Sequence, residues 1–495
     1  MPIMDEPTSL DPQIADSNSE KLVAANCYEG LVRIMADGTI GKGVATDWNI
    51  SDDGLTYTFK LRNNSHWAMF SGHKAVLGEN YEDTFDITVK AEDFKFGIER
   101  TLSAQTGSAD APLFSAVKSI STPDDFTIVF NLSYADDNFL YALTNPGAMP
   151  CDEEFFNLTN GKYGLDAKYL LCNGPFHVSK WTEKTSVKLV KNNEYNGESS
   201  VSPSSVTFYI NNDDSEVADK MNSVTYDVAF LSSSQFSSIE NKKDLNSVAV
   251  QNVTYSFIFN QNDNNYRNKN MRLAFCRSCD TSSLFDSQSD ISKADGIVPP
   301  SCKIGGEDYR NGNAAELLSY DETLAKKNFN DALLELGSSS VETTILCTEQ
   351  YEPFVKQMVQ KLQKTLGVKF VSTVKVVSES DLEAAVNDGN YSVAFYPFKA
   401  KSSFAGEIIE GFDKNNIFGY ESDVLSQKIR NIKNNSGSLE GERSAVADAE
   451  NYLVSEAVIM PVFYENSYFV TSKKTSGIYF YSSADNVCFI NAKKS

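Results

Sequence analysis

A short alternating segment near the start of the chain restricts the fold more than any other part of it. Asp53-Gly54 is a turn pair in which glycine can take a positive φ, and Asp37-Gly38 is an earlier one. After Gly54, apolar and polar residues alternate, with Leu55, Tyr57 and Phe59 set against Thr56, Thr58 and Lys60. A period of two is typical of a β-strand with one buried face. The sequence therefore predicts a β-rich opening to a large domain.

Several short motifs accompany this segment in a definite order. They are Leu10-Asp11-Pro12, Tyr28-Glu29-Gly30-Leu31-Val32, the strand that ends in Leu61-Arg62, and Trp67. Later motifs are Asn173-Gly174-Pro175-Phe176, Trp181, Lys191-Asn192-Asn193-Glu194-Tyr195 and Asn268-Lys269-Asn270-Met271-Arg272-Leu273-Ala274-Phe275. Together they closely resemble the oligopeptide/dipeptide-binding family of ABC importers, which is solute-binding protein family 5. The resemblance spans nearly the whole chain and is strongest before residue 105 and at 173–195.

The resemblance implies an α/β fold of the periplasmic-binding-protein type (type II, large cluster C), with two α/β lobes, a hinge and an extra small domain. Lobe I is expected to comprise residues 1–38, 173–255 and 465–495. Residues 39–172 would form the extra small domain, inserted in lobe I, and residues 256–464 would form lobe II. Two crossings of the chain, near 255–260 and 460–465, would make a hinge that closes on a ligand in the cleft between the lobes.

Length and composition agree with a large globular protein. A chain of 495 residues can bury an extensive core and favours two or three lobes. Hydrophobic residues make up 41% and charged residues 22%, and no run approaches the ~18 apolar residues needed for a membrane-spanning helix. The net charge of −23 argues against a nucleic-acid partner, because the phosphate backbone would be repelled.

The amino terminus lacks the signal-peptide pattern of a basic start, an apolar core and small residues at a cleavage site. Members of the family are exported, so the resemblance implies that a signal segment or a lipoprotein anchor was removed upstream of Met1. The protein is therefore expected to be extracytoplasmic, either periplasmic or a cell-surface lipoprotein.

Periodicity predicts further helices and strands. Acidic residues followed by apolar positions at helical spacing predict a helix over 91–102. Amphipathic patterns predict helices over 320–337, 350–367 and 444–459, and strands are expected over 206–210, 226–230, 255–260 and 393–397. Residues 68–88 are an insertion relative to the family pattern, with an acidic run from Glu79 to Asp86, and are predicted to form a surface loop or a short hairpin.

Candidate ligand contacts follow from the resemblance, position by position. They are Asp16, Ser17 and Asn18, then Phe114, then Tyr396, Phe398, Lys399 and Lys401, and finally Glu465. In peptide-binding relatives the ligand lies as an extra strand whose backbone hydrogen-bonds to the protein backbone. The expected function is that of a monomeric solute-binding component of an ABC importer. It would capture a peptide-like ligand and deliver it to the membrane permease and ATPase subunits.

One candidate position departs from the family pattern. Peptide binders hold the α-ammonium of the ligand with an aspartate where this chain aligns Lys401. At an effective dielectric of about 20 and a separation of ~4 Å, a favourable charge contact contributes roughly 4 kcal/mol and a like-charge contact costs about as much. Either Asp16 or Glu465 therefore reads the ammonium, or the ligand is an anion, a blocked peptide or another solute. Oligosaccharides and metal chelates are the other ligand classes that the resemblance leaves open.

The cysteines leave more than one pairing open. Cys276-Arg277-Ser278-Cys279 has CxxC spacing and Cys302 follows closely. A zinc site would need a fourth ligand, and no histidine lies nearby, so a disulfide among these three or unpaired thiols are the remaining alternatives. Cys151 and Cys172 would close a short loop and form the second candidate pair.

No motif points to catalysis. His66 and His73 lie near Glu79 and Asp83, but the spacing fits no established metal-ligand pattern, and His177 is expected to be structural. The chain has no Gly-x-Ser-x-Gly elbow and no phosphate-binding glycine loop. With 67 acidic residues, any proposed catalytic carboxylate pair would be at the level of chance. We therefore expect a binding protein with no catalytic residue, cofactor or metal, and a hydrolase only as a remote alternative.

Overall fold

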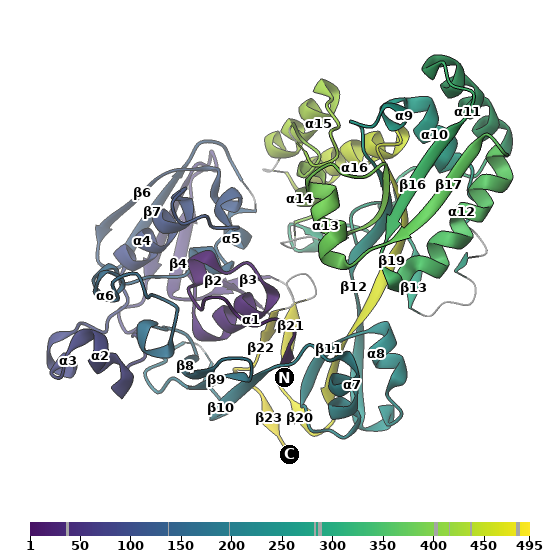
Figure 1. The fold of residues 1–495 in the computed structure, drawn as a ribbon. Coiled ribbons are helices and arrows are strands. Elements are labelled where there is room, and N and C mark those ends of the chain that lie inside the picture. Colours follow the sequence, from purple (N-terminus) through teal and green to yellow (C-terminus); the bar gives the residue numbers. More distant parts are fainter. Residues whose placement is uncertain are drawn as a thin grey trace. The chain divides into compact units, whose positions relative to one another are not determined.

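Two long strands carry the chain from one part of the fold into the other and back. The structure, a computed structural model, divides into unit 1, Met1–Ala249 with Tyr468–Ser495, and unit 2, Val250–Ser467. Strand β12 (Leu245–Phe259) begins in unit 1 and ends in unit 2, and β19 (Ile459–Ser472) leads back (Figure 1). The structure describes residues 1–35, 39–136, 138–197, 199–281, 284–285, 290–399, 404–414, 416–435, 438–481 and 486–495.

The described residues of unit 1 form two four-stranded sheets. The first consists, in spatial order, of β1 (Pro2–Ile3), β10 (Ser205–Ile210), β9 (Ser186–Lys191) and β8 (Phe176–Thr182). The second consists of β4 (Ala45–Ile50), β5 (Thr56–Leu61), β7 (Thr127–Leu132) and β6 (Val117–Asp124). Three smaller pairs are β2 (Val32–Ile34) with β3 (Ile40–Lys42), β20 (Thr475–Ser476) with β23 (Lys493–Lys494), and β21 (Tyr479–Tyr481) with β22 (Asn486–Cys488).

The helices of unit 1 are mostly short. They are η1 (Pro12–Ile14), α1 (Asn18–Cys27), η2 (Ser71–His73), α2 (Lys74–Leu77), α3 (Tyr81–Thr84), α4 (Ala91–Leu102), η3 (Ala111–Phe114), α5 (Phe139–Ala142), η4 (Pro146–Ala148), α6 (Glu153–Leu158), η5 (Ala167–Tyr169), α7 (Asp214–Asn222), α8 (Ser233–Ser238) and η6 (Lys242–Asp244). The predicted helix over 91–102 is α4, so this prediction is confirmed. The carboxylate of Asp93 accepts the Lys90 amide at 2.7 Å and satisfies one donor of the first turn.

The alternating segment forms the predicted strand, β5. Tyr57, Phe59 and Leu61 are buried at 3%, 0% and 7% exposure, whereas Lys60 is exposed. Phe59 packs edge-on against Phe130 of the neighbouring strand β7, with ring centroids 5.8 Å apart. Edge-to-face aromatic pairs of this kind contribute about 0.5–1.5 kcal/mol beyond their burial. The buried face of β5 thus builds a core between distant parts of unit 1.

The insertion at 68–88 is not the predicted loop or hairpin. It forms η2, α2 and α3, three short helical turns. His73 is 1% exposed, and its Nε2 lies 3.1 Å from the Leu170 carbonyl oxygen. Its ring also packs 4.4 Å from that of Phe70 and edge-on against Phe155. Local sequence patterns do not predict these turns, because part of their packing is against distant residues such as Phe155 and Leu170.

Unit 2 holds most of a seven-stranded sheet with the order β11-β19-β12-β18-β16-β17, in which β13 also pairs with β19. Its strands besides β12 and β19 are β11 (Val228–Ser232, in unit 1), β13 (Ile291–Lys293), β16 (Val341–Cys347), β17 (Phe370–Val376) and β18 (Val393–Lys399), and β14 (Lys303–Ile304) pairs separately with β15 (Glu307–Asp308). The helices are α9 (Asn264–Arg267), α10 (Lys269–Arg277), α11 (Glu322–Leu336), η8 (Glu349–Tyr351), α12 (Glu352–Leu366), α13 (Glu379–Asn387), α14 (Gly406–Glu410), α15 (Asp423–Asn434) and α16 (Leu439–Ser455).

Helices cover both faces of the sheet in unit 2 (Figure 1). On one face, α10, α11 and α12 pack with Val341, Ile345 and Phe395. On the other, α13, α15 and α16 pack with Leu346 and Ala394. The alternation of Ala394 and Phe395 between the two faces follows from the two-residue period of strand β18. This helix–sheet–helix arrangement explains why the strand reads as a nearly continuous apolar run.

The predicted elements of unit 2 are largely confirmed, with two corrections. Helices α11 and α12 and strand β18 lie where the sequence predicted them, whereas the strand predicted over 255–260 is the end of β12, which begins at Leu245. The helix predicted over 444–459 is α16, which begins earlier, at Leu439, and ends at Ser455. Ala457 has a positive φ of 50°, and the chain then enters β19 at Ile459. A left-handed alanine terminates a helix, and the apolar run that follows suits a buried strand.

The motifs that define the resemblance meet around Glu29 in unit 1. The Asn173 side chain accepts the Glu29 amide at 3.0 Å and donates to the Glu29 carbonyl at 2.9 Å. The Glu29 carboxylate forms an ion pair with Arg62 and accepts the Tyr195 hydroxyl at 3.0 Å. A Cβ at Gly174 would lie 2.6 Å from the backbone of Cys27, so the close approach requires glycine. These motif residues therefore hold the scaffold together.

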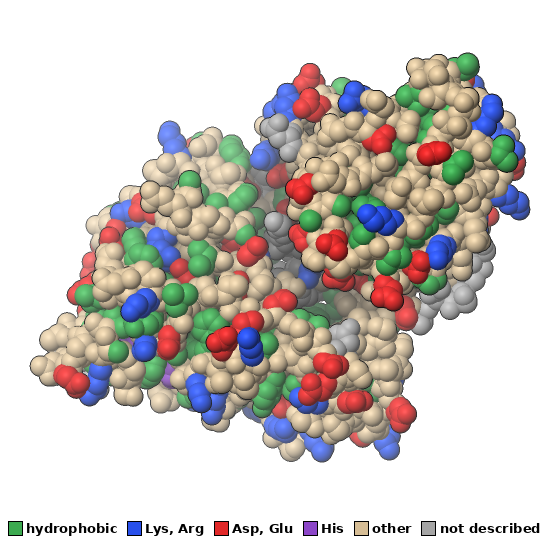
Figure 2. All heavy atoms as spheres, in the orientation of Figure 1, with side chains coloured by type: hydrophobic (Ala, Val, Ile, Leu, Met, Phe, Trp, Pro, Cys, Tyr) green, Lys and Arg blue, Asp and Glu red, His purple; other side chains and the backbone are tan. Residues whose placement is uncertain are grey.

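Acidic residues outnumber basic ones in this chain, and many residues of both kinds lie on the surface. The sequence contains 67 Asp and Glu against 44 Lys and Arg. Figure 2 shows acidic and basic side chains interspersed over the visible surface of each unit. Exposed pairs at helical spacing, such as Glu322 and Lys326 at 2.5 Å, contribute only about 0.3–0.5 kcal/mol each. The stability of the fold therefore depends mainly on its buried groups.

Candidate functional site

The predicted contact residues Asp16, Ser17 and Asn18 form the start of helix α1 in unit 1. Ser17 is the N-cap, and its Oγ accepts the Glu20 amide at 3.2 Å. Asp16 and Asn18 are exposed. Asp16 can therefore offer a carboxylate and Asn18 an amide to a ligand, while the Ser17 hydroxyl already caps the helix.

The Glu20 side chain stabilises this turn through hydrogen bonds. Its carboxylate accepts the amides of Asp16 at 3.0 Å and Ser17 at 3.2 Å, and the hydroxyl of Thr8 at 2.7 Å. Burial opposes ionisation, but the hydrogen bonds from Asp16, Thr8 and Ser17 outweigh it and lower the pKa of Glu20. The capping box thus stays charged at neutral pH and fixes the backbone on which Asp16 and Asn18 are mounted.

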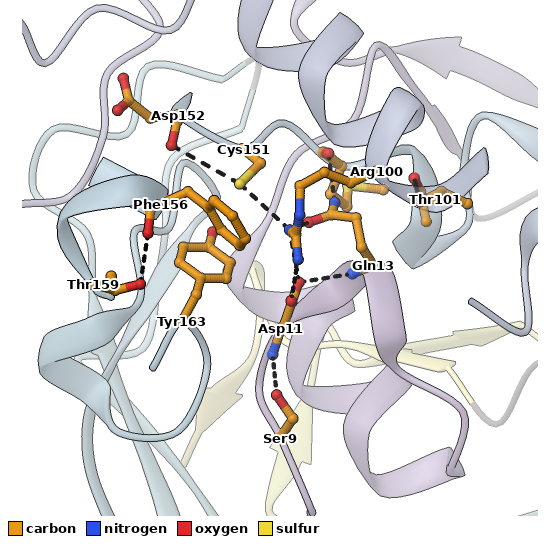
Figure 3. Close-up of polar contacts among 12 residues, drawn as sticks. Ser9, Asp11, Gln13, Arg100, Thr101, Cys151, Asp152, Phe156, Thr159 and Tyr163 are labelled. Carbon is orange, nitrogen blue, oxygen red and sulfur yellow. Dashed lines mark hydrogen bonds and ion pairs between the residues drawn. The ribbon is translucent and has the colours of Figure 1, made fainter. Parts of the chain in front are cut away.

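A buried ion pair fixes the preceding segment, the Leu-Asp-Pro motif (Figure 3). The carboxylate of Asp11 accepts Arg100 Nη2 at 2.6 Å, and the Gln13 side chain accepts Arg100 Nη1 at the same distance. The Arg100 guanidinium also lies over the Phe156 ring, 4.1 Å from its centroid. Burial opposes the charge of Arg100, but the hydrogen bond and the charge of Asp11 raise its pKa. Asp11 thereby ties the first segment of the chain to helix α4.

Phe114 lies at the end of η3 and is fully buried, with 0% exposure. Its neighbour Leu113 is half-buried and Ser115 is exposed. In this conformation Phe114 packs in the interior of unit 1, so its part in ligand contact stays a prediction about the segment around it.

Tyr396 and Phe398 lie on the same face of strand β18 in unit 2. Both are half-buried, with ring centroids 5.7 Å apart. Phe398 stacks on Phe412 at 5.7 Å and contacts Phe418 at 5.8 Å. The two predicted contacts are thus the partly exposed edge of an aromatic cluster that forms part of the core.

Glu465, on β19, lies in a polar group on unit 2. Its Oε1 accepts the Tyr351 hydroxyl at 2.5 Å and the Gln350 amide at 3.5 Å. The Tyr351 ring also packs against that of Tyr255 of β12, with ring centroids 4.3 Å apart. Burial raises the pKa of Glu465, although the bonds from Tyr351 and Gln350 and the charge of Lys399 act in the opposite direction. The structure therefore brings Glu465 and Lys399 into electrostatic contact within one unit.

This polar group can accept a cationic or hydrogen-bond-donating group. Glu465 is half-buried, and its raised pKa means that its negative charge is incompletely compensated by the protein. A ligand ammonium or amide placed beside it would supply the missing compensation. Lys399 is exposed at the end of β18, whereas Lys401 lies outside the described residues.

Tyr351, Gln350 and Tyr255 were not among the predicted site residues. Tyr351 precedes Glu352-Pro353, where proline marks the first turn of α12. In the sequence, the signal that could have identified these site residues was an aromatic and an amide residue immediately before the start of a helix. Their contact with Glu465, more than a hundred residues later in the chain, depends on the strand order of the sheet.

The cysteines and histidines of the chain are buried or half-buried. All eight cysteines are thiols in the structure. Cys276 and Cys279 belong to one core cluster of unit 2 and Cys302 to the other. His177 is half-buried and stacks on Phe70 at 5.6 Å. Within the described part of the chain, no group of three or more His, Cys, Asp or Glu is arranged to hold a metal ion.

Within the same described ranges, no helix is both long and apolar enough to span a bilayer.

Comparison with solved structures shows the fold over the full length of the chain. A dipeptide-binding protein from Pseudoalteromonas sp. SM9913 in complex with Met-Leu matches with a TM-score of 0.79 at 17% identity, covering 100% of this chain and 99% of that chain. Listeria monocytogenes OppA bound to peptide matches with a TM-score of 0.77 at 21% identity, covering 100% and 98%. The predicted α/β fold of the periplasmic-binding-protein type is confirmed.

Sequence comparison identifies the family. The dipeptide-binding protein DppE of Bacillus subtilis is 24% identical over 496 aligned residues, which cover 96% of this chain and 88% of the relative. The family described as bacterial extracellular solute-binding proteins, family 5 Middle, matches residues 39–418, which is more than half of the chain. The chain therefore belongs to family 5 of the bacterial extracellular solute-binding proteins.

Proposed function

We propose that this protein is the extracytoplasmic solute-binding component of an ABC importer and that it captures a peptide-like ligand. The end-to-end similarity to a protein named as dipeptide-binding, over 96% of the chain, carries this proposal. The names of other relatives, such as the oligopeptide-binding protein OppA of Bacillus subtilis, agree with it. The protein acts by binding, not by catalysis, and hands its ligand to a membrane permease driven by ATPase subunits.

The proposed contacts follow the resemblance and lie on both units. They are Asp16, Ser17, Asn18 and the segment around Phe114 in unit 1, Tyr396, Phe398, Lys399 and Glu465 in unit 2, and Lys401, which lies outside the described residues. Within unit 2 we add Tyr351 and Gln350, because they bond directly to Glu465. Glu465 is the proposed acceptor for a peptide ammonium, since burial raises its pKa and leaves its charge incompletely compensated by the protein.

We further propose that residues 39–172 form a small domain inserted in the first lobe, as the resemblance implies. The complete sheet of β4, β5, β7 and β6 lies inside this range, which supports a domain boundary there. We also propose that the protein works as a monomer and is either periplasmic or held at the cell surface by a lipid anchor.

A thermal-shift screen tests the proposal. The panel contains free peptides of about two to eight residues, the same peptides N-acetylated, and oligosaccharides, because a ligand of the folded state raises the unfolding midpoint by mass action. A rise with free peptides alone supports peptide capture through the ammonium. A rise with acetylated peptides as well supports peptide capture without ammonium recognition. Stabilisation only by oligosaccharides overturns the peptide proposal.

A further inference from the structure

Cys27 and Cys172 meet in the interior of unit 1. Cys27 is the last residue of helix α1, and its carbonyl accepts the Gly174 amide at 2.9 Å. Cys172 stands two residues before Gly174, and its own carbonyl accepts the Ala68 amide at 2.7 Å. The two side chains are 0% and 1% exposed. The backbone segments that carry them are in close contact, because a Cβ at Gly174 would lie 2.6 Å from the carbonyl carbon of Cys27. Burial and the neighbouring Cys172 thiol raise the pKa of the Cys27 thiol. These backbone contacts thus place the two cysteines next to each other.

Other cysteines are directed at different partners. Cys151, which the sequence suggested as a partner for Cys172, has its Sγ 3.5 Å from Arg100 Nη1 and 4.0 Å from the Asp152 carbonyl (Figure 3). In unit 2, Cys279 Sγ lies 3.1 Å from the sulfur of Met358. The geometry therefore favours Cys27 over Cys151 as the neighbour of Cys172.

We propose that Cys27 and Cys172 are joined by a disulfide bond in the exported protein. The two thiols lose two protons and two electrons as their S–S bond forms. The electrons pass to an oxidant of the disulfide class, either a small molecule or a thiol–disulfide oxidoreductase, whose own S–S bond is cleaved to two thiols. Such oxidants belong to the extracytoplasmic environment that the family name indicates.

The bond forms while the chain folds. Thiolate is the attacking species in disulfide exchange, and burial raises the pKa of the Cys27 thiol well above its ordinary value. In the packed protein neither sulfur is accessible to an oxidant or a reductant. Once closed, the bond ties the end of α1 to the segment before β8, beside the hydrogen bonds between Glu29 and Asn173. It therefore restricts the unfolded chain over a long loop.

Peptide mapping of the full-length protein tests the proposal directly. The protein is refolded in a buffer of reduced and oxidised glutathione, its remaining thiols are alkylated after unfolding, and it is digested with trypsin without reduction. Cleavage separates the three relevant cysteines, with Cys27 in residues 22–33, Cys151 in 119–162 and Cys172 in 169–180. We expect a linked species of peptides 22–33 and 169–180 that disappears on reduction. Alkylation of both cysteines, or a link to peptide 119–162, would overturn the proposal.

Two variants provide a second test of the proposed disulfide bond. In Cys151→Ala the link between peptides 22–33 and 169–180 should persist, because Cys151 takes no part in it. Oxidised wild-type protein, unfolded by heat with and without dithiothreitol, should show a lower midpoint with the reductant. Cys27→Ala combined with Cys172→Ala should show no such difference. An equal response of wild type and double variant to the reductant would argue against the bond, and the wild-type map stands even if the variant does not fold.

Discussion

The side chain of Asn173 forms two hydrogen bonds with the backbone of Glu29, a residue 144 positions earlier, accepting its amide at 3.0 Å and donating to its carbonyl at 2.9 Å. Asn173 is 1% exposed. The two residues belong to separate sequence motifs, and this contact joins the end of helix α1 to the segment that leads into β8. It gives a physical reason for the presence of both motifs.

Asn173→Ala should lower the free energy of unfolding by about 2–3 kcal/mol, because it leaves a buried amide and a buried carbonyl without partners. Equilibrium denaturation followed by circular dichroism measures the loss. Asn193→Ala is the matched control, since Asn193 is exposed and should change stability by less than about 0.5 kcal/mol. Equal effects of the two substitutions would contradict the role assigned to Asn173.

Arg100→Met should lower the free energy of unfolding by about 3–5 kcal/mol, because it leaves the Asp11 carboxylate buried without its ion-pair partner. The side chains of this pair are only 12% and 4% exposed. Lys95→Met breaks an exposed pair with Glu92 on the same helix and should cost no more than about 1 kcal/mol. A loss for Arg100→Met no greater than that of Lys95→Met would show that the pair contributes little.

Acidification should destabilise the protein partly through His73. Burial lowers the pKa of His73 from 6.5 to about 4 in the folded protein. The unfolded chain therefore binds more protons than the native state between these two values, so stability falls as the pH falls through this window. The full contribution is about 3 kcal/mol, at about 1.4 kcal/mol for each pKa unit.

The difference between wild type and His73→Gln isolates this effect from other titrating groups. Unfolding midpoints are compared at about pH 7 and about pH 5, where His73 is protonated mainly in the unfolded chain. The wild-type midpoint should drop more on acidification than that of the variant. The same drop in both proteins would mean that His73 is not responsible.

Glu465→Gln should weaken the binding of free peptides by roughly tenfold to a hundredfold, since a charge-assisted hydrogen bond contributes about 1.5–3 kcal/mol. Binding of N-acetylated peptides should change little. Isothermal titration calorimetry measures both, and Glu440→Gln, at an exposed position of α16, is the control for the lost charge. Equal weakening for free and acetylated peptides would remove Glu465 as the group that reads the ammonium.

In the absence of ligand, the Glu465→Gln variant should be no less stable than the wild type. The pKa of Glu465 is raised in the folded protein, so its charge disfavours folding as the pH rises through that pKa, and a neutral glutamine relieves this cost. A ligand-free midpoint at least as high as that of the wild type at neutral pH therefore separates a loss of binding from a loss of folding.

Local patterns predicted the elements whose burial repeats regularly along the chain. The alternation in β5 and the helical spacing in α4, α11 and α12 reflect one buried face, and each element lies where it was predicted. Residues 68–88 were mispredicted because much of their packing involves distant segments, as in the contacts of His73 with Phe155 and Leu170, which no local period reveals. The end of α16 was misjudged for a similar reason. Arg272 donates hydrogen bonds to the carbonyls of Ala457 at 3.0 Å and Glu456 at 3.1 Å, at the end of that helix.

By itself, the sequence determined the family, the α/β fold and most of the regular elements, because motif order and side-chain periodicity are properties of the chain read in one direction. Tertiary structure alone decided which side chains meet. It paired Glu465 with Tyr351 instead of leaving it an isolated hinge residue, buried Phe114, and placed Cys27 beside Cys172. Hydrogen bonds and burial depend on atoms brought within a few ångströms by the packing of strands and helices, and spacing along the chain does not encode that proximity.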